Sequence, residues 1–259
     1  MMPPGESFPR ARAAARRAIE IEETLAEPHA TLGYLQTVYE RDWAGAERGF
    51  RRSIELNPDY GRAHHWFAFY FQTIGSESEA LASIRRAWDL DPFSPVINAE
   101  VACFYVFARQ YDRGVREALK AIEVDPEDSS AYRTLARAYA LQGKASEVAA
   151  AVEQSLRFSQ RAPVPLSEGG ASLAVVGRKE EARKLLEELL DRAENEYIFP
   201  ALPALIYACL GEKNRAFEYY EKAIEERSLV ASWLRDPLLD GIRSDPRFPK
   251  LFEGIGLEP

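Results

Sequence analysis

The sequence predicts an all-α protein in which helix hairpins are stacked one after another into a solenoid. Three observations predict this fold class: a spacing of 34 residues that recurs along the chain, apolar residues at helical intervals inside each period, and glycine or proline at regular places between the helices. Because a hairpin of this length buries its apolar face only against its neighbours, repeated hairpins must stack to be stable.

The period is visible in several residue types at once. Pro58, Pro92 and Pro126 stand 34 residues apart and follow the similar segments FRRSIELNP, IRRAWDLDP and LKAIEVDP. Multiples of the same spacing relate three further sets: Gly75, Gly143, Gly177 and Gly211; Ala46, Ala80, Ala182 and Ala216; and Phe71, Tyr105, Tyr139 and Tyr207. Four sets that share one frame indicate an internal repeat rather than chance.

The frame divides the chain, taken as a single domain over 1–259, into a half-repeat, six units and a C-terminal capping element. The first unit has 35 residues, so it contains one inserted residue. The half-repeat is 8–25, the units are 26–60, 61–94, 95–128, 129–162, 163–196 and 197–230, and the cap is 231–259.

Each unit is predicted to contain two helices. The first half carries large apolar residues at helical spacing, such as Tyr132, Leu135 and Tyr139. A glycine then suits the left-handed end of that helix. The second half carries small residues seven apart, such as Ala80 and Ala87, which allow close approach of helices, and a proline ends most of the early units.

Unit 163–196 departs from this composition. Gly169 and Gly170 fall inside its first helix, where each glycine costs about 1 kcal/mol relative to alanine. We therefore expect this helix to be short or irregular.

The two ends lie outside the full units. The segment RARAAARRAIEIEE places Ala11, Ala15 and Ala18 at the packing positions of a second helix that lacks its partner. This predicts that the chain is the C-terminal part of a longer array or multidomain protein; the alternative is a standalone protein whose first helix caps the array. Asp236-Pro237 and Asp245-Pro246 resemble capped helix starts, so the tail is expected to fold over the last unit.

The period and the distribution of large, small, glycine and proline positions resemble the tetratricopeptide repeat (TPR) over residues 8–230. The resemblance implies a right-handed α-α superhelix. The stretch DWAGAERGFRRSIELNPDYGRAHHWFA and the tail LRDPLLDGIRSDPRF are also similar to C-terminal TPR arrays of bacterial signalling and transcription-regulator proteins.

Composition excludes several classes of partner. The net charge is −8, which argues against nucleic acid, and no apolar stretch approaches the length of a membrane span. The N-terminus has no apolar signal-peptide region. Cys103 and Cys209 form no ligand-spaced pair, which predicts free thiols and a cytoplasmic protein.

No motif predicts catalysis, a cofactor or a metal site. The sequence lacks a glycine-rich phosphate loop, G-x-S-x-G and H-E-x-x-H, so we expect no enzyme. His64 and His65 are adjacent in AHHWFAFYF and point about 100° apart on a helix, so they cannot easily share a metal ion. We interpret His64 as a packed, hydrogen-bonded side chain and most of the stretch as core.

The resemblance implies that the first helix of each unit lines the concave face, where such arrays bind partners. The predicted partner-binding residues are Arg62, His65, Phe69, Gln72, Arg133 and Arg137. In the last two units the same positions are mostly small or apolar: Val164, Ser167, Ala171, Ala174, Ile198, Ala201, Leu205 and Ala208. They either form an apolar groove for a helix or extended peptide, or contact one another under tight curvature.

The predicted function is therefore a scaffold for protein–protein interaction, in which a protein or peptide binds in the concave groove. Basic residues such as Arg133 and Arg137 would pair with acidic groups, so changing both to glutamate is expected to weaken binding without unfolding the array. Two alternatives stay open: a sensor or regulatory portion of a larger bacterial transcription regulator or kinase, and an array that self-associates through its N-terminal edge.

Overall fold

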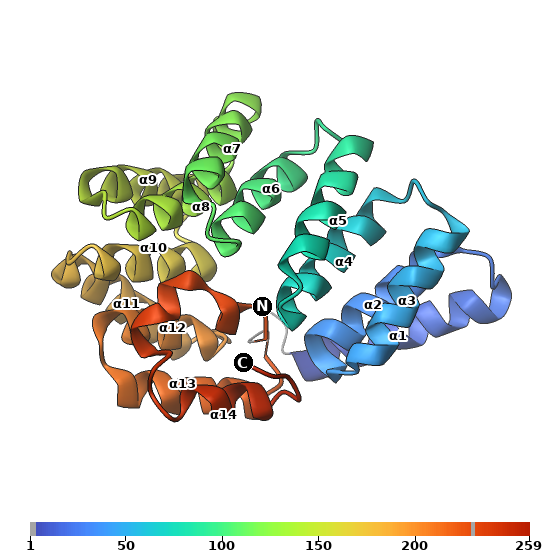
Figure 1. Cartoon of the computed structure of the whole chain (residues 1–259). Helices are drawn as coiled ribbons and strands as arrows, with labels where there is room; N and C mark the ends of the chain where they lie inside the picture. The colour runs from blue at the N-terminus through green and yellow to red at the C-terminus, as the bar shows by residue number, and fades with distance from the viewer. Residues whose placement is uncertain (1–3, 229–230) are drawn as a thin grey trace.

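The computed structural model describes residues 4–228 and 231–259, and these residues form helices without any strand. The helices follow one another around an arc, as Figure 1 shows. They are α1 (Pro4–Ile21), α2 (Ala26–Leu35), α3 (Trp43–Leu56), α4 (Gly61–Ile74), α5 (Glu77–Leu90), α6 (Pro95–Phe107), α7 (Tyr111–Val124), α8 (Ser129–Leu141), α9 (Ala145–Phe158), α10 (Pro163–Val175), α11 (Lys179–Ala193), α12 (Ala201–Leu210), α13 (Lys213–Glu225) and α14 (Phe248–Glu253). In the described part of the chain, no helix has the length and apolar character needed to cross a bilayer.

Successive helices pack as antiparallel pairs, which confirms the all-α hairpin array. The pairs are α2 with α3, α4 with α5, α6 with α7, α8 with α9, α10 with α11 and α12 with α13. The first helices of neighbouring pairs also contact each other, from α2 through to α12. Gly75, Gly143, Gly177 and Gly211 all have positive φ at the end of a first helix or one residue beyond it, where the glycine spacing predicts left-handed residues.

The inserted residue of the first unit is absorbed by a wider helical turn. The 10 residues of α2 continue into η1 (Gln36–Glu40), a π-helix of 5 residues, whereas the equivalent α4 has 14 residues and stays α-helical. A π-turn accommodates one extra residue without changing where the helix enters and leaves. Arg41 then takes the left-handed conformation that Gly75 takes in the next unit.

The first helix of unit 163–196 is regular, contrary to the sequence-based expectation. α10 is an uninterrupted helix of 13 residues. A Cβ atom on Gly169 would lie 3.0 Å from Val152 Cγ1, and one on Gly170 would lie 2.8 Å from Ile206 Cδ1. The glycines therefore let α10 approach α9 and α12 closely, and this packing outweighs the intrinsic preference of glycine against helix.

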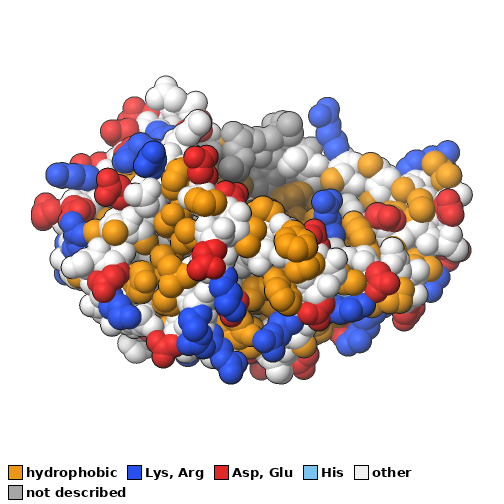
Figure 2. All heavy atoms as spheres, turned by 90° about the horizontal axis from the view of Figure 1, so that it is seen from above, with side chains coloured by type: hydrophobic (Ala, Val, Ile, Leu, Met, Phe, Trp, Pro, Cys, Tyr) orange, Lys and Arg blue, Asp and Glu red, His pale blue; other side chains and the backbone are white. Residues whose placement is uncertain are grey.

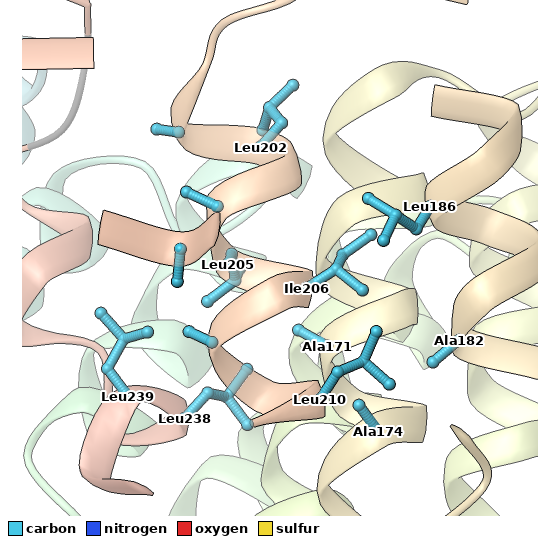
Figure 3. Close-up of a cluster of buried hydrophobic side chains, with 14 of the residues drawn as sticks. Ala171, Ala174, Ala182, Leu186, Leu202, Leu205, Ile206, Leu210, Leu238 and Leu239 are labelled. Carbon is cyan, nitrogen blue, oxygen red and sulfur yellow. The ribbon is translucent and has the colours of Figure 1, made fainter. Parts of the chain in front are cut away.

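The largest apolar core lies in the C-terminal units and includes the tail. Figure 3 shows side chains of α12, among them Leu205 and Ile206, between α10 and α11 on one side and Leu238 and Leu239 of the tail on the other. Leu205 and Leu239 are almost completely buried. The tail is thus part of the hydrophobic core and not an appendage to it.

The tail contains two 3₁₀ segments and the short helix α14. The segments are η2 (Trp233–Arg235) and η3 (Pro237–Ile242). Asp236 caps η3 by accepting a hydrogen bond from the Leu238 N–H, as the Asp-Pro pattern predicts. η2 contacts α4, and η3 contacts α8, α10 and α12, all of which are first helices. The tail therefore lies on the concave face, inside the arc of Figure 1.

The tail contacts the last unit, where it was expected to fold, and it also reaches the first unit. The Arg41 guanidinium donates to the carbonyls of Ile224 at 2.9 Å and Gly254 at 3.3 Å. Trp43 Nε1 donates to the Ile255 carbonyl at 3.1 Å. Because Ile224 and Gly254 lie at the C-terminal ends of α13 and α14, Arg41 also meets the negative ends of two helices.

Candidate functional site: the concave face and its tail

The concave face has two halves with different surroundings. We call the face of α2, α4 and α6 the N-terminal half, and the face of α8, α10 and α12 the C-terminal half. The predicted partner-binding residues fall in both, since Arg62, His65, Phe69 and Gln72 lie on α4 and the two arginines lie on α8.

The N-terminal half presents a mixture of aromatic and polar side chains. Arg62 is exposed, and its guanidinium lies 5.6 Å from the ring centre of Trp66. Trp66 in turn stacks on Tyr34 of the preceding unit, with ring centres 4.8 Å apart. Phe69 is half-buried against the core of the second and third units. Together these contacts hold a partly exposed aromatic surface between neighbouring units.

His65 lies in the same half and is favoured in its neutral form. Burial lowers the pKa of His65, the Glu100 carboxylate opposes that effect, and Arg62 adds to the lowering. A neutral imidazole at pH 7 can both donate and accept a hydrogen bond. His64 lies outside this group and has the predicted hydrogen bond, from its Nε2 to the Pro58 carbonyl at 2.9 Å.

The C-terminal half contains a buried cluster of charges. Arg137 Nη2 lies 2.8 Å from Glu168 Oε2 and 3.2 Å from Asp236 Oδ2, and all three side chains are at most 5% exposed. Arg133 approaches the same Glu168 at 3.3 Å. The guanidinium of Arg137 also lies 5.4 Å from the ring centre of Phe107. The cluster joins α8, α10 and the tail.

The protonation of this cluster follows from burial and pairing. Burial by itself would lower the pKa of Arg137, but Asp236 and Glu168 outweigh it and raise that pKa. Burial raises the pKa of Asp236, although Arg137 acts in the opposite direction. Arg137 therefore stays charged, and its charge is already neutralised within the chain.

The tail covers this half of the face, so two predicted site residues are not available to a partner in this structure. Arg137 is buried beneath the tail, and Arg133 is partly covered and paired with Glu168. The apolar positions Ala171, Leu205 and Ala208 are buried as well. Of the two alternatives for the last units, contact between the helices is present: α10 and α12 pack together, and the Ser167 hydroxyl donates to the Leu202 carbonyl at 2.7 Å. The chain's own tail lies against the same helices.

The turns between first and second helices add further contacts to the tail. Five residues occupy the same position of the 34-residue repeat as Gly75: Arg41, Arg109, Gly143, Gly177 and Gly211. A Cβ atom added to any of these three glycines would have no other atom within 4 Å. Arg41 and Arg109 are left-handed like the glycines, and both bind the tail, Arg109 through Asp240 at 2.7 Å. Gly75 instead packs against the guanidinium of Arg235 from the tail.

Several of these residues were not predicted from the sequence. Glu168 and Asp236 complete the buried cluster, and Glu100 acts on His65. Two signals were present: Glu168 is the only charged residue in the helix PVPLSEGGASLAV, and arginine interrupts the glycine spacing at 41 and 109. At both places, a residue that departs from the repeat pattern makes a contact that the pattern does not predict.

Two free cysteines, Cys103 and Cys209, lie on first helices that form the face. Burial raises the pKa of the Cys103 thiol to about 12, so it is protonated at neutral pH, and burial also raises the pKa of the free Cys209 thiol. Among residues 4–228 and 231–259, no group of three or more His, Cys, Asp or Glu side chains is placed to hold a metal ion.

Comparisons with known proteins agree with this architecture. Residues 204–228 match the family model described as tetratricopeptide repeat. The structure of PilF from Pseudomonas aeruginosa is 20% identical, with a TM-score of 0.52 over 83% of this chain and 92% of that one. TTC0263, a TPR protein of Thermus thermophilus, is 18% identical with a TM-score of 0.61, covering 71% of this chain and 98% of its own.

A third structure is that of the APC/C hetero-tetramer Cut9–Hcn1. It is 16% identical with a TM-score of 0.65, and the match covers 90% of this chain and 46% of that one. At these identities the likeness concerns the fold. With the repeat period and the helix pairs, it shows a fold like that of tetratricopeptide-repeat proteins, and residues 204–228 match the model of that repeat.

Proposed function

We propose that the protein is a protein–protein interaction scaffold whose partner segment lies on the N-terminal half of the concave face. The observation that carries this proposal is the tail itself. A polypeptide segment already occupies the C-terminal half, held by ion pairs, by a hydrogen bond from Cys209 Sγ to the Leu238 carbonyl and by buried leucines. These are the contacts by which such grooves hold a peptide, and the N-terminal half has similar groups that are exposed or partly exposed, such as Arg62 and Phe69.

The exposed residues of that half define the chemistry of the partner. Arg62 can pair with a carboxylate, Phe69 offers an apolar contact, and neutral His65 can hydrogen-bond to a backbone amide or carbonyl. An extended segment with an acidic residue next to an apolar one fits this set. In this proposal Arg137 pairs with the tail and Arg133 pairs with Glu168 beside it, so neither arginine binds the partner.

The face shown in Figure 2 favours local recognition over a broad electrostatic field. Figure 2 shows Lys and Arg side chains intermingled with Asp and Glu around hydrophobic patches on the face that it displays. No chemical step is part of the proposal, and the free thiols Cys103 and Cys209 are in keeping with a reducing, cytoplasmic setting. The matched chain of the Cut9–Hcn1 structure, whose fold is similar, belongs to a hetero-tetramer.

Site-specific photo-crosslinking in the source cells tests the proposal. A benzophenone amino acid at Phe69 is expected to label one partner protein, whereas the same group at Ala82, exposed on the second helix of the same unit, is not. With that partner, Arg62→Glu should weaken binding about tenfold or more, because a charge-assisted contact becomes a repulsive one. Arg86→Glu is the matched control on the second helix. Equal labelling from both positions, or unchanged affinity of Arg62→Glu, would contradict the assignment.

A further inference from the structure

A pocket of about 220 Å³ lies where the tail meets the second and third units. It is enclosed by the end of α4, the start of α5, the end of α6 and the tail on either side of η3. For comparison, an apolar cavity of about 150 Å³ holds a benzene molecule. The pocket therefore has room for one ring and a short polar group. It differs from the surface around Arg62 and Phe69, which lies along the side of α4.

The inner wall of the pocket is apolar. Phe104, Phe107 and Ala80 are at most 9% exposed and line it, and Leu81 and Ala108 complete this wall. Aromatic and aliphatic carbons of this kind favour burial of an apolar group, at about 25 cal/mol per Å² removed from water. The wall thus selects for the non-polar body of a ligand.

Three guanidinium groups lie at the other side of the pocket. Arg109 makes two hydrogen bonds of 2.7 Å to the carboxylate of Asp240, and Arg243 Nε makes a third of 2.7 Å to the same group. Glu77 also lines the pocket. Three positive charges thus face two negative ones, and the local charge is positive in a protein whose net charge is −8.

Arg235 is the cation without an acidic partner. Its Nε donates to the Thr73 carbonyl at 2.8 Å and its Nη2 donates to the Glu258 carbonyl at 3.0 Å, both neutral acceptors. Within the described chain it forms no ion pair, and its guanidinium packs against Gly75. Burial lowers the pKa of Arg235, Arg243 lowers it further, and Glu77 only partly offsets them. An anion beside Arg235 would relieve this uncompensated charge.

We propose that this pocket binds a small organic carboxylate, with its apolar body against Phe104 and Phe107 and its carboxylate paired with Arg235. The apolar wall contacts one part of such a ligand and Arg235 pairs with another part. A hydrocarbon or a bare anion would therefore make only one of the two contacts. Since the tail supplies Arg235 and Arg243, the bound acid would connect the tail to α4 and α6. Binding should therefore also raise the melting temperature.

A titration with 3-phenylpropionate, followed by calorimetry and thermal denaturation, tests the proposal. We expect saturable binding of about millimolar affinity or tighter for a ligand of this size. The neutral 3-phenylpropionamide and the ring-free propionate should each bind about tenfold more weakly or less. Equal binding of the amide would overturn the carboxylate assignment, and absence of saturation for every aromatic acid would overturn the site.

Two variants locate the binding. Arg235→Gln should weaken 3-phenylpropionate binding about tenfold to a hundredfold, while Arg215→Gln, an exposed arginine on α13, should leave it unchanged. Ala108→Phe fills the pocket without changing charge and should abolish binding. It therefore tests the pocket as the binding site even if Arg235→Gln disturbs the fold. Unchanged binding in both pocket variants would overturn the proposal.

A last titration distinguishes two kinds of ligand that carry both a ring and a carboxylate: a free aromatic acid and the C-terminus of a peptide. A carboxylate next to an aromatic ring also occurs at the end of a polypeptide that terminates in phenylalanine. N-acetyl-glycyl-phenylalanine is expected to bind more weakly than 3-phenylpropionate, because the pocket has room for little beyond the ring and acid. Tighter binding of the peptide would overturn the free-acid assignment. None of these outcomes depends on a partner at Phe69.

Discussion

The two halves of the concave face use equivalent helix positions for different purposes. On α4, His65 and Phe69 are partly exposed, and their neighbours Trp66 and Tyr34 link adjacent units through an aromatic stack. On α8, the residue equivalent to Phe69 is Arg137, which is buried and paired with two carboxylates. The tail causes this difference, since the helices themselves follow one template. Whether a groove is available for a partner is thus decided outside the repeat.

The C-terminal half also shows how the tail is held in one register. Leu239, Ile242 and Phe252 are fully buried and supply most of the apolar contact. A buried ion pair adds little net stability, because desolvation of the charges offsets their attraction, but a wrongly placed partner would leave a charge unpaired. We therefore attribute stability to the apolar side chains and placement to the cluster of Arg137, a division that the first predictions test.

The largest effect is expected from Arg137→Ala. Removal of the guanidinium leaves Asp236 buried without its ion pair and Glu168 with only the longer contact to Arg133, which should lower the free energy of unfolding by about 3–5 kcal/mol. Urea denaturation followed by circular dichroism measures it. Arg62→Ala, the control in the N-terminal half, should cost under about 0.5 kcal/mol because Arg62 is exposed. Similar costs for the two variants would remove the distinction between the halves.

The same cluster changes one expectation drawn from the sequence, namely that glutamate at positions 133 and 137 weakens binding without unfolding the array. Glutamate at position 137 would place three carboxylates together under the tail, so this change should unfold the tail rather than only weaken partner binding. Arg133→Glu is milder because Arg133 is about one-fifth exposed. The two single variants should therefore differ clearly in the urea midpoint.

Leu239→Ala should have the next largest effect. The side chain is 1% exposed and faces Leu205, so its truncation leaves a cavity and is expected to cost about 2–4 kcal/mol. Leu119→Ala on α7, where the leucine is 43% exposed, is the matched control and should cost about 1 kcal/mol or less. A loss at Leu239 no larger than that at Leu119 would show that the tail adds little to the core.

Much of the helical array could be predicted because its signals are periodic. The 34-residue spacing locates each hairpin, and the glycine positions locate the left-handed turns at Gly75, Gly143, Gly177 and Gly211. Even the π-helix at Gln36–Glu40 corresponds to the one extra residue of the first unit. A signal that recurs along the chain is reinforced at every repeat, whereas a single contact is not.

The rest depends on contacts that occur once. The regular helix through Gly169 and Gly170 reflects close approach of Val152 and Ile206, which intrinsic propensity does not describe. The position of the tail depends on residues far apart in the sequence, such as Arg137 and Asp236. Arg133 and Arg137 were assigned to the concave face as partner-binding residues, but the repeat pattern does not predict their contacts with Glu168 and Asp236.

The turn at Arg109 allows a smaller and more selective test of the tail contacts. Arg109→Ala loses the pair with Asp240 and keeps a side chain in a left-handed conformation, so it should cost about 1 kcal/mol. Arg109→Gly loses the same pair but relieves the backbone strain, so its net effect should be close to zero. Thermal denaturation of the two variants separates strain from pairing. Gly143→Ala, where no atom lies near an added Cβ, isolates the strain alone.

The smallest expected effect concerns the pH dependence of the Arg109–Asp240 pair. Its hydrogen bonds with Arg109 lower the pKa of Asp240 below the ordinary 3.8. A lowered pKa in the folded state means that the pair contributes its stability above pH 3.8 and loses it as the pH falls through the lowered value. Because Asp240 is 45% exposed and screened by solvent, Asp240→Asn should cost only about 0.5 kcal/mol at pH 7. The difference from the unaltered protein should shrink below about pH 4 in urea titrations. A difference that grew on acidification would contradict the pairing and, with it, the link between the third unit and the tail.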